Sequence, residues 1–110
     1  MRTRRILGTA AAGALLSGIA LIPATPAFAA ASGDYTGSGV RIRKCPQTTS
    51  GCAVHGLGYP GQGTSITCYK LGEQTGGTNI WYYHRNRATG VTGYSHSGQI
   101  SVTSGTIPRC

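Results

Sequence analysis

The sequence predicts an all-β fold, a small barrel of five or six short strands that follows a cleaved helical signal peptide. After residue 30 no stretch repeats apolar residues every three or four positions, which an amphipathic helix requires. The chain's 18 Gly and 5 Pro suit tight turns between short strands. Residues 80–94 add a hairpin pattern, because two β-prone segments flank a short polar connection that ends in Gly90.

The first 29 residues have the organisation of a secretory signal peptide. Residues 1–5 carry three positive charges, an apolar run covers residues 6–22, and a small-residue box follows at residues 27–29. This order predicts cleavage after Ala29, or alternatively after Ala31. A permanent membrane anchor is the competing interpretation, but the three Gly of the apolar run argue against it. We therefore expect a secreted, monomeric chain with no stable membrane anchor, free to associate with the cell wall.

The exported part is small and basic. Cleavage after Ala29 leaves 81 residues, and we assign residues 30–38 to a flexible tail and residues 39–110 to one domain. The signal peptide removes three of the ten Lys and Arg and neither of the two acids, which leaves a net charge of +5. A basic surface suits an anionic partner such as cell-wall polymer or acidic membrane lipid. Nucleic acid is not expected, because no recognition helix or ribonucleoprotein-type motif is present.

All four cysteines lie in the exported part, at Cys45, Cys52, Cys68 and Cys110. An even count in an oxidising compartment predicts two disulfides, with three possible pairings. We favour Cys45–Cys52, which closes a short loop, and Cys68–Cys110, which ties the C-terminus to the sheet. A domain this small buries little apolar surface, so we expect these cross-links to contribute much of its stability.

The first half of the domain divides into two strands and a loop. Residues 39–43 alternate apolar and charged side chains, which predicts a half-buried strand with Val40 and Ile42 pointing inward. Residues 45–52 contain Pro and a polar run, so they form a loop fixed at both ends. Residues 54–58 are a candidate short strand.

The second half contains the remaining strands. Residues 59–62, Tyr-Pro-Gly-Gln, have the pattern of a type II turn, and residues 64–69 form the next strand. Residues 71–79 hold three Gly and are expected to form a wide loop. After the hairpin at 80–94, a short 3₁₀ turn and a last strand at 100–102 complete the chain.

The hairpin supplies most of the candidate binding residues. Strand alternation places Trp81 and Tyr83 on one face and Tyr82 on the other, so one of the two sets must point inward. Aromatic rings stack on sugars and apolar groups, and arginines bind carboxylates and phosphates. The candidate ligand-binding residues are Trp81, Tyr83, Tyr94, Tyr59, Arg41, Arg43 and Arg85. The alternative is that about half of these aromatic side chains belong to the core.

Catalytic and metal sites are not expected, nor is a cofactor. A hydrolytic triad needs an acid, and the only candidates are Asp34 in the predicted tail and Glu73 in a glycine-rich segment. Paired carboxylates for glycoside cleavage are not expected from these two acids either. A zinc site that combines cysteines with His55 or His84 is the alternative to disulfides, but the gap between the first two cysteines is wider than usual for zinc ligands.

Several segments together resemble the bacterial SH3 (SH3b) domain family. The resemblance rests on Val-Arg-Ile-Arg at 40–43, Tyr-Pro-Gly-Gln at 59–62, Ile66, Trp81, and Gly-Val-Thr-Gly-Tyr at 90–94. The resemblance covers about residues 39–102. Within this family, the chain is similar to small secreted SH3-like proteins of high-GC Gram-positive bacteria. The resemblance implies an SH3-like barrel that binds peptidoglycan peptides or another cell-wall component without catalysis.

Two functions follow as hypotheses. The first is a secreted SH3b-like module that binds the cell wall through aromatics of the hairpin and the nearby arginines. The second is a secreted protein–protein interaction factor or inhibitor, for which the loop between Cys45 and Cys52 would offer a rigid insertion element. The partner is therefore a cell-wall polymer or peptide, or alternatively an extracellular protein.

Overall fold

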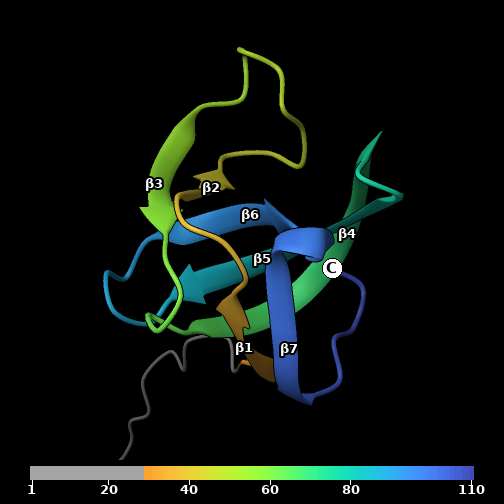
Figure 1. Cartoon of the computed structure of the whole chain (residues 1–110). Coiled ribbons are helices and arrows are strands. Elements are labelled where there is room, and N and C mark those ends of the chain that lie inside the picture. The colour runs from red at the N-terminus through yellow and green to blue at the C-terminus, as the bar shows by residue number, and fades with distance from the viewer. Residues whose placement is uncertain (1–28) are drawn as a thin grey trace, which may run out of the picture.

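The computed structural model describes residues 29–110 (Figure 1). The predicted signal peptide, residues 1–29, lies outside the described residues except for Ala29. Within the described part the all-β prediction is confirmed, with seven strands where we expected five or six. They are β1 (Ala31–Tyr35), β2 (Val40–Arg43), β3 (Val54–Gly58), β4 (Thr64–Thr75), β5 (Thr78–Asn86), β6 (Thr92–His96) and β7 (Ile100–Gly105), with a 3₁₀ turn, η3 (Ser97–Gln99), before β7. No helix in residues 29–110 is long and apolar enough to cross a membrane.

All seven strands belong to one antiparallel sheet in the order β3-β2-β6-β5-β4-β1-β7, which curls into a half-barrel (Figure 1). β4 lies between β5 and β1 in this order: it pairs with β5 along most of its length and with β1 over residues 64–66. The β4–β5 register shifts between Ile66 and Cys68 and again between Leu71 and Thr75. Such irregularities bend and twist a strand, and β4 is accordingly long and strongly curved.

The inner face of the curled sheet holds a small apolar core. Val40 and Ile42 are 2% and 0% exposed whereas Arg41 between them is exposed, which confirms their predicted inward orientation. The buried members of the core are Ala31, Tyr35, Val40, Ile42, Ile66 and Ile100. The core thus combines residues of β2, near one end of the sheet, with residues of β4, β1 and β7, toward the other end.

Tyr35 and His84 form a polar pair inside this core. The Tyr35 hydroxyl lies 3.1 Å from Nε2 of His84, and Nδ1 of the same ring lies 3.2 Å from the carbonyl oxygen of Tyr82. Because a carbonyl oxygen only accepts, Nδ1 carries the proton and Nε2 accepts from the tyrosine hydroxyl. Burial lowers the pKa of His84 and raises the pKa of Tyr35 to about 12, so both side chains are neutral at pH 7.

The prediction of a flexible tail at residues 30–38 is wrong, because this segment contains β1, which pairs with both β4 and β7. Ala31 and Tyr35 are only 4% and 3% exposed. The segment is small and polar because its middle passes close to a neighbouring strand: a Cβ on Gly33 would overlap the Ser101 carbonyl oxygen of β7. Small side chains here therefore reflect close packing between two strands rather than freedom of the chain.

The wide loop expected at residues 71–79 is also wrong, because β4 continues to Thr75 and β5 begins at Thr78. Thr75 and Thr78 are cross-strand partners, so the connection has only two residues, Gly76 and Gly77. Their φ angles are 56° and 93°, the positive values that a tight hairpin turn needs and that Gly adopts without strain. The three Gly of this segment thus build a hairpin turn and a bulge.

The hairpin predicted at 80–94 is confirmed, since β5 pairs with β6 from Trp81–His96 to Arg85–Thr92. The Asn86 side chain closes the connection, where its Oδ1 accepts from the backbone N–H groups of Ala88 and Thr89 at 2.9 and 3.1 Å. Asparagine is suited to this role because its amide oxygen can stand in for a backbone acceptor in a turn.

Both favoured disulfides are present, Cys45–Cys52 and Cys68–Cys110, and no cysteine of residues 29–110 is free. The zinc alternative therefore has no thiol available in this part of the chain. The loop of the first disulfide is also held at its tip, where the Glu73 carboxylate accepts from the backbone N–H of Thr48 at 2.7 Å and from its hydroxyl. This contact joins the loop to the far end of β4.

Candidate functional site

Most of the predicted binding residues lie on the outer face of the sheet, the face opposite the core. Directly opposed residues of neighbouring antiparallel strands share a face. Arg43 of β2 opposes Tyr94 of β6, which in turn opposes Tyr83 of β5. Trp81 of β5 opposes His96 of β6, and strand alternation adds two further arginines to the same face. Of the seven candidates, this face carries Arg41, Arg43, Trp81, Tyr83, Arg85 and Tyr94.

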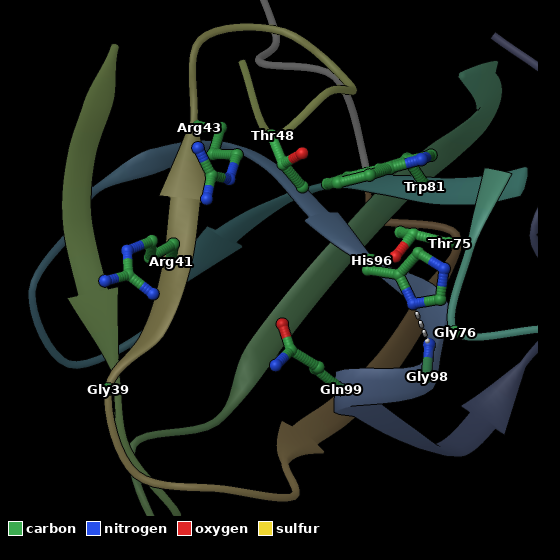
Figure 2. A pocket seen from close by; sticks show the side chains of 10 residues that line it. All are labelled: Gly39, Arg41, Arg43, Thr48, Thr75, Gly76, Trp81, His96, Gly98 and Gln99. Atoms are coloured by element: carbon green, nitrogen blue, oxygen red, sulfur yellow. Dashed lines mark hydrogen bonds between the residues drawn. The ribbon is translucent and has the colours of Figure 1, made fainter. Parts of the chain in front are cut away.

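A cleft of about 400 Å³ is hollowed into this face between β2 and the end of β6 (Figure 2). In Figure 2 the two arginines of β2 stand on one side of it, and His96, Gly98 and Gln99 stand on the other. The residues that line the cleft are Gly39, Arg41, Arg43, Thr48, Thr75, Gly76, Trp81, His96, Gly98 and Gln99. Four separate segments thus form its walls: β2, the disulfide loop, the β4–β5 turn, and the chain around η3.

Arg41 and Arg43 are placed by the alternation of β2. Val40 and Ile42 are buried beneath the strand, so the two guanidinium groups must project from the outer face. Arg41 is exposed and Arg43 is half-buried. Neither arginine forms an ion pair within residues 29–110, so their donors remain available to a ligand.

The opposite wall is made rigid by His96. Its Nδ1 accepts from the backbone N–H of Gly98 at 3.1 Å, and its Nε2 lies 3.0 Å from the carbonyl oxygen of Thr78. Nε2 therefore carries the proton and donates to that carbonyl. The imidazole packs edge-on against Trp81 with ring centroids 5.2 Å apart and is 8% exposed. Both ring nitrogens are thus occupied by the main chain.

Trp81 forms part of the floor of the cleft and is only 2% exposed. Its indole Nε1 donates to the carbonyl oxygen of Glu73, near the end of β4, at 3.0 Å. This burial corrects the expectation that Trp81 offers an open aromatic face to a ligand. Its role is to support the cleft rather than to stack on what enters it.

Tyr83 and Tyr94 lie beside the cleft, on the row that begins with Arg43. Their ring centroids are 5.1 Å apart with an interplanar angle of 57°, and both side chains are half-buried. Arg85 is exposed on the same face but does not line the cleft. Tyr59 is 42% exposed and lies in the turn after β3, apart from the other candidates.

The charge of the cleft is decided by where the two acids of the described chain lie. Hydrogen bonds from the backbone N–H groups of Gly61 and Gly63 lower the pKa of Asp34, which caps the turn before β4. A hydrogen bond from the backbone of Thr48 lowers the pKa of Glu73. The charge of Arg43 also lowers the pKa of Glu73, so this carboxylate lies within electrostatic reach of the cleft although it does not line it. The charged groups that line the cleft are the two guanidinium ions. The cleft is therefore chemically suited to a carboxylate or phosphate.

The three histidines are dispersed through the structure. His84 is buried in the core, His96 is bound to the main chain, and His55 is exposed with Nδ1 3.1 Å from the Thr92 carbonyl oxygen. Within residues 29–110 no three metal-ligating side chains come together, and none of these rings forms a hydrogen bond with a carboxylate. The geometry of these residues thus offers binding groups and no assembled nucleophile and base.

The sequence did not indicate the neutral members of the cleft, which include Thr48, Thr75 and Gln99. They come from the disulfide loop, the β4–β5 turn and η3, which lie far apart in the chain. The strand register held one usable signal: Trp81 opposes His96, so a correct β5–β6 alignment puts this histidine on the face of the arginines.

No protein-family model, curated protein or solved structure matches this chain. The class of protein is described by its fold and site alone: a small, disulfide-linked all-β protein with a basic cleft on the outer face of a curled sheet.

Proposed function

We propose that this chain is a secreted, non-catalytic SH3b-like binding module that recognises a cell-wall component, such as a peptidoglycan peptide, through an anionic group. The observation that carries the proposal is that Arg41 and Arg43 line one cleft from which both acids are absent. Arginine binds carboxylates by paired, charge-assisted hydrogen bonds, which are stronger than those between neutral groups.

The spacing of the arginines suits a small anionic group. Alternate residues of a strand lie about 6.8 Å apart, so Arg41 and Arg43 can approach one carboxylate from two sides. The hydroxyl of Thr75 and the amide of Gln99 line the same cleft on the side opposite the arginines and can bind neutral polar groups of the same ligand. A peptide stem with a free carboxylate supplies both kinds of group.

The non-catalytic part of the proposal is supported by the state of the polar side chains. Asp34 and Glu73 each accept hydrogen bonds that fix a turn or a loop, and both nitrogens of His96 are bound to the main chain. An acid or base that is committed in this way is poorly placed to exchange protons with a substrate. Secretion is supported by the two disulfides, which are compatible with an oxidising compartment.

Sedimentation with purified sacculi tests the proposal directly. Arg41→Gln and Arg43→Gln each remove one charged donor, and a hydrogen bond to a charged group is worth about 1.5–3 kcal/mol, so each variant should bind at least tenfold more weakly. Arg109→Gln is the matched control, because it removes the same charge from the C-terminal segment outside the cleft. Equal retention of all three variants contradicts the site, and no retention of the wild type contradicts the ligand.

A second candidate is a secreted protein–protein interaction factor or inhibitor. It is supported by the exposed apolar side chains of the edge strand β3 and the following turn, where Val54, Leu57 and Tyr59 are each 42–43% exposed. An edge strand can pair with an extended segment of a partner. Leu57→Asp should then abolish the capture of extracellular proteins and leave sacculus binding intact. Loss of both, or of neither, contradicts this second function.

A further inference from the structure

The row formed by Arg43, Tyr94 and Tyr83, here called the tyrosine row, continues the cleft across the outer face. The three residues are consecutive cross-strand partners on β2, β6 and β5. Arg43 belongs to the cleft and to the row at once. A ligand whose anionic group is held by this arginine therefore meets the two tyrosine rings next.

The exposed chemistry of the row is that of aromatic edges and phenol groups. The rings meet at 57° and both are half-buried, so each covers part of the other's face. Within residues 29–110 neither phenol forms a side-chain hydrogen bond, whereas the core residue Tyr35 pairs with His84. Phenol groups beside a ring surface bind a partner that is apolar on one side and rich in hydroxyls, such as a sugar ring.

The dimensions of the row fit one sugar residue next to the anion site. Neighbouring strands lie about 4.8 Å apart, so Arg43 and Tyr83 are separated by about 10 Å across two strand spacings. A saccharide that carries a carboxylate or phosphate can span this distance with its charge on the arginine and its ring over the tyrosines. A peptide without a ring leaves the tyrosines unused.

We propose that the cleft and the tyrosine row together bind an anionic saccharide, with its charged group on Arg41 and Arg43 and its ring against Tyr94 and Tyr83. The inference rests on the proposed function, because it uses the same arginines, and it names the class of ligand. A flat nucleobase fits less well, since it stacks on an open aromatic face and the tilted contact covers part of each ring.

Titration calorimetry with four short probes tests this inference. The probes are tetragalacturonate, which has a carboxylate on every ring, its methyl ester, which keeps the rings without the charge, tetraglutamate, which has the charge without the rings, and a four-residue oligothymidylate. We expect tetragalacturonate to bind at least tenfold more tightly than each of the others. Tyr83→Leu should lower the affinity for tetragalacturonate about tenfold and leave that for tetraglutamate unchanged.

Controls separate this inference from the proposed function. Tyr59→Leu is the matched variant, because Tyr59 is an exposed tyrosine away from the row, and it should bind all probes as the wild type does. Chemical shifts of the Tyr83 and Tyr94 rings in the wild type give a second readout if Tyr83→Leu does not fold; they should move with tetragalacturonate and not with tetraglutamate. Ring signals that move with neither, an ester that binds as well as the acid, or tighter binding of the oligothymidylate overturns the inference. If Arg43→Gln leaves the binding of both acidic probes unchanged, the anion site itself is wrong.

Discussion

Removal of the Cys68–Cys110 disulfide should cost more stability than removal of Cys45–Cys52, because the two cross-links close loops of very different length. The sequence separations are 42 and 7 residues. In the loop-entropy model these correspond to about 4 and about 2.4 kcal/mol of the free energy of unfolding at 25 °C. The first figure is a large part of the 5–15 kcal/mol that typically stabilises a domain.

The native environments of the cysteines adjust these values only in part. Cys52 is 3% exposed, so replacing both cysteines of the short loop by Ala also leaves a small cavity, which adds about 1 kcal/mol. Cys110 is exposed and its replacement disturbs little packing. The long-loop variant should therefore remain the less stable, with a melting temperature lowered by roughly 15–30 °C.

Urea unfolding followed by tryptophan fluorescence gives the measurement, because Trp81 is the only tryptophan and is buried in the fold. The comparison uses Cys68→Ala with Cys110→Ala against Cys45→Ala with Cys52→Ala, each with an unchanged partner disulfide. A smaller loss of free energy in the long-loop variant than in the short-loop variant would refute the reasoning from loop length.

Two further predictions concern the core. Burial lowers the pKa of His84 below its ordinary 6.5, so on acidification the unfolded chain takes up this proton before the folded chain does. The free energy of unfolding should therefore be constant above about pH 6.5. It should fall as the pH drops from 6.5 through the pKa of His84 in the folded state. Urea midpoints between pH 8 and pH 5 measure this fall, which His84→Gln should flatten. Gly58→Ala should destabilise the fold by about 2–3 kcal/mol, because a Cβ there overlaps the buried ring of Tyr35. Gly51→Ala, where a Cβ meets nothing within 4 Å, is its control.

A rise in stability toward pH 5 would contradict the first of these predictions, since it would require the folded state to bind the proton more tightly. Equal urea midpoints for the two glycine variants would contradict the second, because the Tyr35 ring would then have room to move.

The hairpin at 80–94 and both disulfides could be predicted because their signals are local or countable. Alternating β-prone residues flank a connection that ends in Gly90, and four cysteines allow only three pairings. β1 could not be predicted, because apart from Tyr35 its residues are small or polar and lack the aromatic and β-branched side chains that mark strands. It becomes a strand through partners on β4 and β7, more than 30 and more than 60 residues further along the chain.

The candidate site was predictable as a face but not as a cleft. Strand alternation indicates that Arg41 and Arg43 share a side, as do Trp81 and Tyr83. It does not indicate which of these side chains another segment will cover. Trp81 packs against His96 of β6 and donates its indole N–H to Glu73 near the end of β4. The position of Glu73 depends on the bulge and turn after Leu71 rather than on the strand that carries the tryptophan.

Glu73 fixes the position of the disulfide loop at the rim of the cleft in the absence of a ligand. Its N–H donates to the Pro46 carbonyl oxygen, its carbonyl oxygen accepts from Trp81, and its carboxylate holds Thr48. With the loop immobilised at both ends and at its tip, little conformational entropy of the protein is left to lose on association. Differences in affinity among ligands should then report mainly the stiffness of the ligands themselves, with rigid molecules favoured over flexible ones of equal charge.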